Sequence, residues 1–204
     1  PLTFCEIYAV GAHNPCIPGG RAYNPRGYGI RPDISSRRTD GTSYDNPRNQ
    51  YSERTIMNQF KGVAPALGEA LKKRSYTTLT PVQLDVLAPE LGDADLLVSA
   101  QTGSGKTVAF GMSLAPTLLE AAERFQHAEA PLALVVAPTR ELALQVKREL
   151  EWLYEKTGAA FATCVGGMDM RAERQTLRRG VHIVVGTPGR LRDHIERRSL
   201  DMNQ

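Results

Sequence analysis

From residue 57 onward, segments with a helical spacing of apolar residues alternate with short continuous apolar runs. The apolar positions of 64–74 recur at intervals of three and four, which predicts an amphipathic helix. The run 131–137 is almost wholly apolar, as in a strand that is covered on both faces. In chain order, the pattern predicts helices at 64–74, 81–87, 106–124 (bent near Pro116), 139–154, 170–179 and 189–197, and strands at 95–100, 131–137, 159–165 and 182–185.

Strands that alternate with helices predict an α/β fold, with a parallel sheet, right-handed crossovers and helices on both faces. In such a sheet a ligand lies beyond the carboxyl ends of the strands. We therefore expect the segments that directly follow the strands to form one functional rim.

The first 56 residues differ from the rest of the chain. Six prolines and six glycines fall within the first fifty positions, without a sustained period of 2 or 3.6. We expect 1–56 to be a disordered or non-native extension and 57–204 to form the domain. Because the chain begins with Pro1 and its first methionine is Met57, we favour translated upstream sequence over the alternative, an RNA-binding arm of arginines and tyrosines.

Charge, cysteine content and the length of the apolar runs limit the partners and the compartment that we expect for this protein. The 204 residues carry a net charge of only +3, but 166–204 contain eight arginines against five acidic residues. This local excess of positive charge fits a surface that binds a phosphate backbone, and it fits a solvated helix face equally well. Three cysteines without paired spacing favour a reducing cytoplasm. No apolar run reaches the roughly 20 residues that span a bilayer, so we expect no membrane partner.

A glycine-rich segment after the run 95–100 has the spacing of a phosphate-binding loop. It follows the pattern G-x-x-x-x-G-K-[ST], except that Ala100 replaces the first glycine. Gly103 and Gly105 let backbone N–H groups approach an anion, Lys106 can reach the β- and γ-phosphates, and Thr107 can ligate Mg²⁺. The predicted nucleotide contacts are Ala100, Gln101, Thr102, Gly103, Ser104, Gly105, Lys106 and Thr107.

Three further motifs follow predicted strands: 138–142, 166–167 and 187–190. They are expected on the same rim as the phosphate loop. Upstream, Tyr76 precedes Gln83 by seven residues. An aromatic ring can stack on a purine, and one side-chain amide can pair with the N6 and N7 edge of adenine.

Together, these segments resemble the first RecA-like domain of DEAD-box RNA helicases, of bacterial type, from about residue 60 to about residue 201. The segments 100–107, 138–142 and 187–190 are similar to motifs I, Ia and Ib of that family, and 76–83 to its Q motif. Two departures are that Ser75 replaces the usual glycine before Tyr76, and that the upstream aromatic, Phe60, lies two residues nearer Gln83 than expected.

The resemblance implies a RecA-like P-loop NTPase that uses ATP and Mg²⁺. It assigns adenine to Gln83 and Tyr76, places Thr78 in the same nucleotide site, and gives Lys106 and Thr107 the catalytic contacts to phosphate and metal. It also implies a largely sequence-independent site for single-stranded or duplex RNA, formed by Pro138, Thr139, Arg140, Glu141, Gly166, Gly167, Thr187, Pro188, Gly189 and Arg190.

Each assignment has a structural alternative. Gln83 can cap its own helix, Arg140 can pair with an acidic group, and Tyr76 can pack in the core. Trp152 and Tyr154 fit a helix face that packs on the core better than a platform for bases.

The Asp-Glu-Ala-Asp tetrad that names the family does not occur in the sequence. The resemblance places it beyond Gln204, followed by a second RecA-like domain. We therefore expect the domain to be incomplete at its C-terminus and truncated before this tetrad. Its parent is expected to be an ATP-dependent RNA helicase, with RNA-stimulated ATP hydrolysis and local duplex unwinding. This chain is expected to bind ATP and single-stranded RNA but to be inactive by itself. The alternatives are a non-catalytic binding module and a DNA helicase of a related superfamily.

Overall fold

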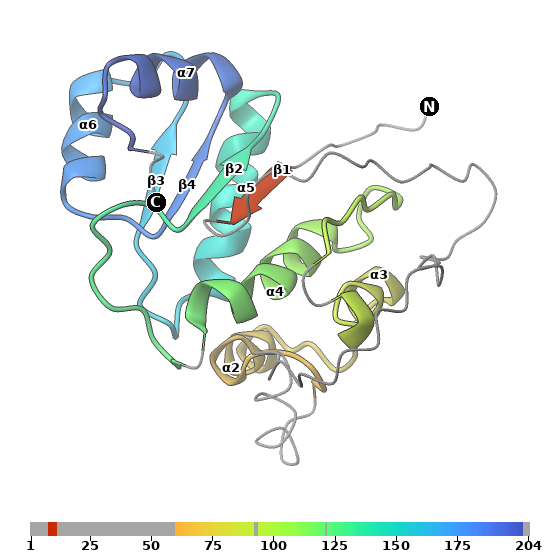
Figure 1. The fold of residues 1–204 in the computed structure, drawn as a ribbon. Coiled ribbons are helices and arrows are strands. Elements are labelled where there is room, and N and C mark those ends of the chain that lie inside the picture. The colour runs from red at the N-terminus through yellow and green to blue at the C-terminus, as the bar shows by residue number, and fades with distance from the viewer. Residues whose placement is uncertain (1–7, 12–59, 92–93, 121, 202–204) are drawn as a thin grey trace, which may run out of the picture.

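A computed structural model describes residues 8–11, 60–91, 94–120 and 122–201 (Figure 1). No helix in these ranges is long and apolar enough to cross a membrane. In chain order the elements are β1 (Tyr8–Gly11), α2 (Pro65–Lys73), α3 (Pro81–Asp85), the 3₁₀ helix η2 (Pro89–Leu91), α4 (Lys106–Leu119), β2 (Ala133–Val136), α5 (Arg140–Leu153), β3 (Phe161–Cys164), α6 (Met170–Arg178), β4 (Ile183–Gly186) and α7 (Pro188–Glu196).

The described strands form one sheet in the order β1-β2-β4-β3. β4 lies between β2 and β3 and is parallel to both, with Ile183 beside Ala133 on one side and Phe161 on the other. The parallel arrangement expected from the sequence is thus confirmed for these three strands. β1 pairs antiparallel with β2. It lies within 1–56, where the sequence predicted neither packed structure nor a strand.

Alternate residues of the strands face two different helical layers. Val135 and Val185 belong to a core shared with α2, α4 and α5, whereas Val184 packs with Leu191 of α7 in a second core. Figure 1 shows α6 and α7 on the opposite side of the sheet from α4. Helices therefore cover both faces, as expected for strands without a polar face.

The prediction of a strand at 95–100 is wrong. Residues 94–101 have no regular secondary structure, and Leu97 is 80% exposed. β2 already pairs with β4 on one edge and with β1 on the other. Residues 94–101 pair with no described strand, so their backbone gains no ladder hydrogen bonds. Helix α4 also ends earlier than expected, at Leu119 rather than at 124, with Pro116 inside it.

Candidate nucleotide site and nucleic-acid interface

The phosphate loop turns into α4 through two glycines with left-handed backbone. Gly103 has φ of 81° and Gly105, which N-caps α4, has φ of 86°. A Cβ atom at Gly105 would lie 2.5 Å from Nε2 of Gln83. Residue 105 is therefore restricted to glycine both by its backbone and by the side chain beside it.

Lys106 is the first residue of α4, where the helix N-terminus contributes partial positive charge. Its ammonium group donates to the carbonyl of Ala100 and, at 2.6 Å, to that of Gln101. The lysine thus binds the start of its own loop, and a phosphate must compete with these two carbonyl groups for it. Thr107 follows in the first turn and is half-buried.

Gln83 joins α3 to the phosphate loop. Its side chain is fully buried; Oε1 accepts from the backbone N–H of Thr80 at 3.0 Å, and Nε2 donates to the carbonyl of Gly105 at 3.3 Å. The hydroxyl of Thr80 donates to the carbonyl of Ser104 at 2.9 Å. Gln83 therefore caps its own helix, the alternative raised from the sequence, and at the same time supports the loop.

One polar atom of the loop has no hydrogen-bond partner in the described part of the chain. Oγ of Ser104 is buried and unpaired. A buried hydroxyl without a partner costs about 1–3 kcal/mol. Together with the glycine turn and the first-turn amides of α4, it forms a cradle that fits an anionic group with several acceptor oxygens, such as a nucleotide phosphate.

Tyr76 lies apart from these contacts. Its ring centroid is 6.0 Å from that of Trp152, and Arg74 lies 5.0 Å above the Trp152 ring. Burial raises the pKa of Tyr76, and the charge of Glu149 raises it further. In the described ranges, no hydrogen bond or ring contact joins Tyr76 to the phosphate loop, and Thr78 is exposed. The structure thus brings Gln83 to the loop, and Tyr76 to α5.

The core interpretation of the other aromatic residues is confirmed. Tyr154 is buried, and its hydroxyl donates to the carbonyl of Gly111 at 2.7 Å. Trp152 is half-buried against the same core. Phe60, the upstream aromatic, is buried in that core as well.

The three segments that follow β2, β3 and β4 lie together on one rim, as expected. Nη1 of Arg140 donates to the carbonyl of Gly166 at 3.3 Å, and Nη2 of Arg190 donates to the carbonyl of Met168 at 3.0 Å. The backbone N–H of Thr187 donates to the carbonyl of Cys164 at 3.0 Å. Arg140 thus binds a neighbouring loop in this structure.

Two helices begin at this rim. Thr139 N-caps α5 by accepting from the N–H of Leu142 at 3.2 Å, and Thr187 N-caps α7 with Pro188 as its first residue. Helix N-termini carry unpaired amides and partial positive charge, which favour phosphate groups. The exposed residues among the predicted nucleic-acid contacts are Pro138, Thr139, Arg140, Glu141, Gly166, Gly167, Pro188 and Gly189.

The sequence of this domain matches a known family over more than half of the chain. Residues 80–204 match the DEAD/DEAH box helicase family. The chain belongs to this family. Its α/β architecture is the RecA-like fold of DEAD-box helicase domains, as its likeness to their solved structures shows.

Individual helicases agree with this membership. The chloroplastic DEAD-box ATP-dependent RNA helicase 3A of Zea mays is 42% identical over 146 residues, covering 70% of this chain and 19% of its own length. The DEAD-box ATP-dependent RNA helicase CshA of Bacillus licheniformis is 38% identical over 146 residues, covering 72% and 29%. The crystal structure of the RNA-helicase Prp28 from Chaetomium thermophilum bound to ADP has a TM-score of 0.60 at 37% identity, covering 69% of this chain and 34% of that chain.

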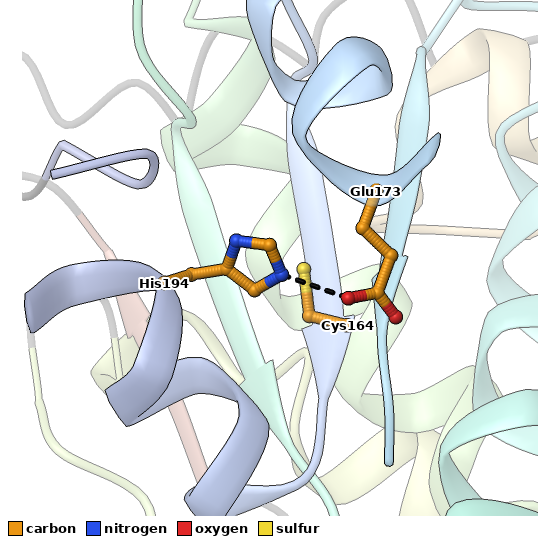
Figure 2. Close-up of side chains that lie close together, drawn as sticks. All are labelled: Cys164, Glu173 and His194. Atoms are coloured by element: carbon orange, nitrogen blue, oxygen red, sulfur yellow. Dashed lines mark hydrogen bonds and ion pairs between the residues drawn. The ribbon is translucent and has the colours of Figure 1, made fainter. Parts of the chain in front are cut away.

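Beneath the rim of this DEAD/DEAH box helicase domain, three buried side chains from β3, α6 and α7 point toward one another (Figure 2). Nε2 of His194 lies 2.8 Å from Oε2 of Glu173, whose Oε1 accepts from the N–H of Val165 at 3.1 Å. Burial raises the pKa of the third residue, Cys164, to about 12, and the charge of Glu173 contributes to this shift.

Cys164, Glu173 and His194 are residue types that bind metals, but their surroundings favour a hydrogen-bonded network. Nε of Arg190 lies 3.7 Å from Oε2 of Glu173, so a guanidinium already supplies positive charge to this carboxylate. The raised pKa keeps the thiol of Cys164 protonated at neutral pH, as in a buried core cysteine. Glu173 and His194 were not predicted as a pair from the sequence, because no local motif joins residues 21 positions apart.

Proposed function

We propose that this chain is the ATP-binding and RNA-binding portion of an ATP-dependent RNA helicase. One observation carries the proposal: a single small domain holds both a phosphate loop and a candidate RNA-binding rim. Gln83 supports the phosphate loop. At the rim, Arg140 and Arg190 bind the carbonyl groups of Gly166 and Met168. The curated relatives described above are ATP-dependent RNA helicases, and the chain spans 19% to 29% of their length. The activity of a whole helicase is therefore part of the proposal.

ATP and Mg²⁺ are the proposed ligands of the phosphate loop. Lys106 leaves the carbonyls of Ala100 and Gln101 and donates to the phosphates, while the hydroxyls of Ser104 and Thr107 face the anion and its metal. Mg²⁺ supplies charge neutralisation when it is bound. The loop amides and the N-terminus of α4 hold the anion in place.

Adenine recognition is proposed for Gln83, within the segment assigned to the Q motif. A side-chain amide has two N–H donors and two acceptor sites, and the contacts to Thr80 and Gly105 use one of each. One donor and one acceptor site remain, which is the pair that the N6 and N7 edge of adenine requires. Because Gln83 is fully buried, this contact requires the loop to open. Stacking on Tyr76 and a contact from Thr78 remain part of the proposal.

RNA is the proposed ligand of the rim. Backbone amides, threonine hydroxyls and an exposed Arg140 recognise phosphate and sugar groups, which carry no base information, so binding is expected to be largely independent of sequence. Contacts to 2′-hydroxyl groups would favour RNA over DNA. A second RecA-like domain, a bacterial type and a cytoplasmic location are parts of the same proposal.

The experiment is a comparison of ATP hydrolysis by this 204-residue chain without nucleic acid, with single-stranded RNA and with DNA of matched length. We expect the chain to bind ATP without RNA-stimulated hydrolysis, and a longer chain that includes an Asp-Glu-Ala-Asp tetrad and a second domain to recover it. RNA-stimulated hydrolysis by the 204-residue chain would contradict the non-catalytic role proposed for it. Equal stimulation of the longer chain by DNA would favour the DNA-helicase alternative.

A further inference from the structure

We propose that Glu173 is a positioning residue that holds the loop 166–169 in the conformation that binds RNA backbone. The proposal rests on the RNA-binding function proposed above and adds to it a residue that no motif contains. Glu173 lies on α6, is buried, and reaches the loop through two partners, the backbone of Val165 and the side chain of Arg190.

Three side chains form hydrogen bonds to the backbone of the loop 166–169 or of Val165, the residue before it. Glu173 accepts from the N–H of Val165 at 3.1 Å. Arg140 donates to the carbonyl of Gly166 at 3.3 Å, and Arg190 donates to the carbonyl of Met168 at 3.0 Å. The two carbonyls thus face protein donors.

The backbone amides of the loop are left accessible. Gly166 and Gly167 are exposed, and within the described part of the chain no hydrogen bond occupies their N–H groups. Gly167 has φ of 78°, a left-handed conformation that changes the direction of successive amides. Amides turned outward form a concavity that attracts phosphate, whereas carbonyls turned outward would repel it. Which of the two groups faces outward therefore decides whether the loop binds an anion.

Glu173 controls this choice through Arg190. The side chains of Arg190 and Glu173 are only 13% and 3% exposed, and Nε lies 3.7 Å from Oε2. His194 contacts the same carboxylate oxygen at 2.8 Å. Without the carboxylate charge, Arg190 would be a largely buried cation lacking its counter-ion, and such a group moves toward solvent. Its donation to Met168 would then be lost, and the loop would no longer be fixed.

The test is the Glu173→Gln variant of the 204-residue chain, titrated with a short fluorescent oligouridine by anisotropy and with a fluorescent ADP. Glutamine preserves the size of the side chain and can still accept from Val165, but it removes the charge. We expect RNA affinity to fall about threefold to tenfold, the range of one typical net hydrogen bond, because the donation from Arg190 to Met168 that fixes the loop is lost. ADP affinity should not change, whereas a general loss of folding would lower both affinities.

The sign of the effect separates positioning from simple electrostatics. Removal of a negative charge would by itself raise RNA affinity. The matched control is Glu196→Gln on α7, because Glu196 is exposed and pairs only with Arg192 among the described residues. We expect this control to leave RNA affinity unchanged or slightly higher. An unchanged or higher RNA affinity in Glu173→Gln would overturn the proposal.

Two further variants keep the outcome decisive. If circular dichroism shows that Glu173→Gln is unfolded, Glu173→Asp retains the charge but withdraws it by one methylene, and a smaller loss of RNA affinity is expected. Arg140→Ala tests the RNA site independently of Glu173. No loss of affinity in Arg140→Ala would contradict the proposed RNA site itself. A loss in Arg140→Ala without one in either Glu173 variant would contradict the positioning role alone.

Discussion

Two glycines of the phosphate loop have the same left-handed backbone but different surroundings. A Cβ atom at Gly103 would meet nothing within 4 Å, whereas one at Gly105 would lie 2.5 Å from Nε2 of Gln83. Alanine at either position carries the cost of a left-handed conformation, about 1–2 kcal/mol. At residue 105 it must also displace a buried amide that holds Thr80.

We therefore expect Gly105→Ala to lower the free energy of unfolding more than Gly103→Ala does. The measurement is urea denaturation of both variants, with the slope of the transition checked to be the same. Equal destabilisation would mean that the amide of Gln83 moves aside freely, and that its contacts with the loop contribute little.

Gln83 itself gives a second prediction at this scale. In Gln83→Ala, the N–H of Thr80 and the carbonyl of Gly105 lose a buried partner, and the free energy of unfolding should fall by about 1–3 kcal/mol. ATP affinity should fall in the same variant, because the loop loses its support. The neighbouring Leu84 is 55% exposed on the same helix, so Leu84→Ala should change stability by less than about 0.5 kcal/mol. Similar losses in both variants would refute the supporting role.

At the scale of elements, local signals in the sequence located helices better than strands. The helix predicted at 139–154 is α5 in the structure, where Thr139 caps its start. The apolar run 95–100 resembled a strand, but a strand also needs a neighbour, and hydrophobicity does not reveal which edge is available. The residues Thr80 and Gln83 form a capping box, which is the structural alternative that the sequence raised for Gln83.

The buried contacts of Glu173 mark the limit of prediction from sequence for the site. Its partner Val165 directly follows β3, and its partners Arg190 and His194 both belong to α7, whereas Glu173 lies on α6. None of these partners lies within one helical turn of Glu173 in the sequence. Only the folding of the chain brings the four residues together. The rim was predictable, since motifs after parallel strands must emerge at the same edge of a sheet.

Cys164, on β3, gives a prediction about pH. Its pKa is raised from 9.0 to about 12 in the folded chain, mainly by burial. The folded state therefore keeps a proton that the unfolded state releases as the pH rises above 9, so this thiol lowers stability with increasing pH. At about pH 10 the loss should reach about 1.4 kcal/mol relative to neutral pH.

The comparison that isolates this effect is between the native chain and Cys164→Ala, unfolded with urea at a series of pH values. The native chain should be more stable near neutral pH, because alanine leaves a small cavity. The difference should shrink between about pH 8 and about pH 10. A difference that is constant with pH would mean that the thiol is not buried away from solvent in the folded state.

At the scale of the whole molecule, the sheet joins two distant parts of the chain. β1 at 8–11 pairs with β2 at 133–136, with Val10 beside Leu134. The domain assignment from the sequence placed the boundary near residue 57, and this pairing crosses it. An edge of β2 without β1 would present unpaired N–H and C=O groups to solvent and to other chains.

Val10→Pro tests whether this pairing stabilises the domain, because proline fixes φ and has no backbone N–H to donate within a strand. If β1 supports the sheet, Val10→Pro and deletion of 1–56 should both lower the temperature of unfolding and increase aggregation, with RNA and ATP affinities unchanged in the folded fraction. A large loss of RNA affinity on deletion, without a loss in Val10→Pro, would instead favour the RNA-binding arm. Equal stability of all three chains would mean that β2 does not need β1, and that residues 1–56 are not required for the domain to fold.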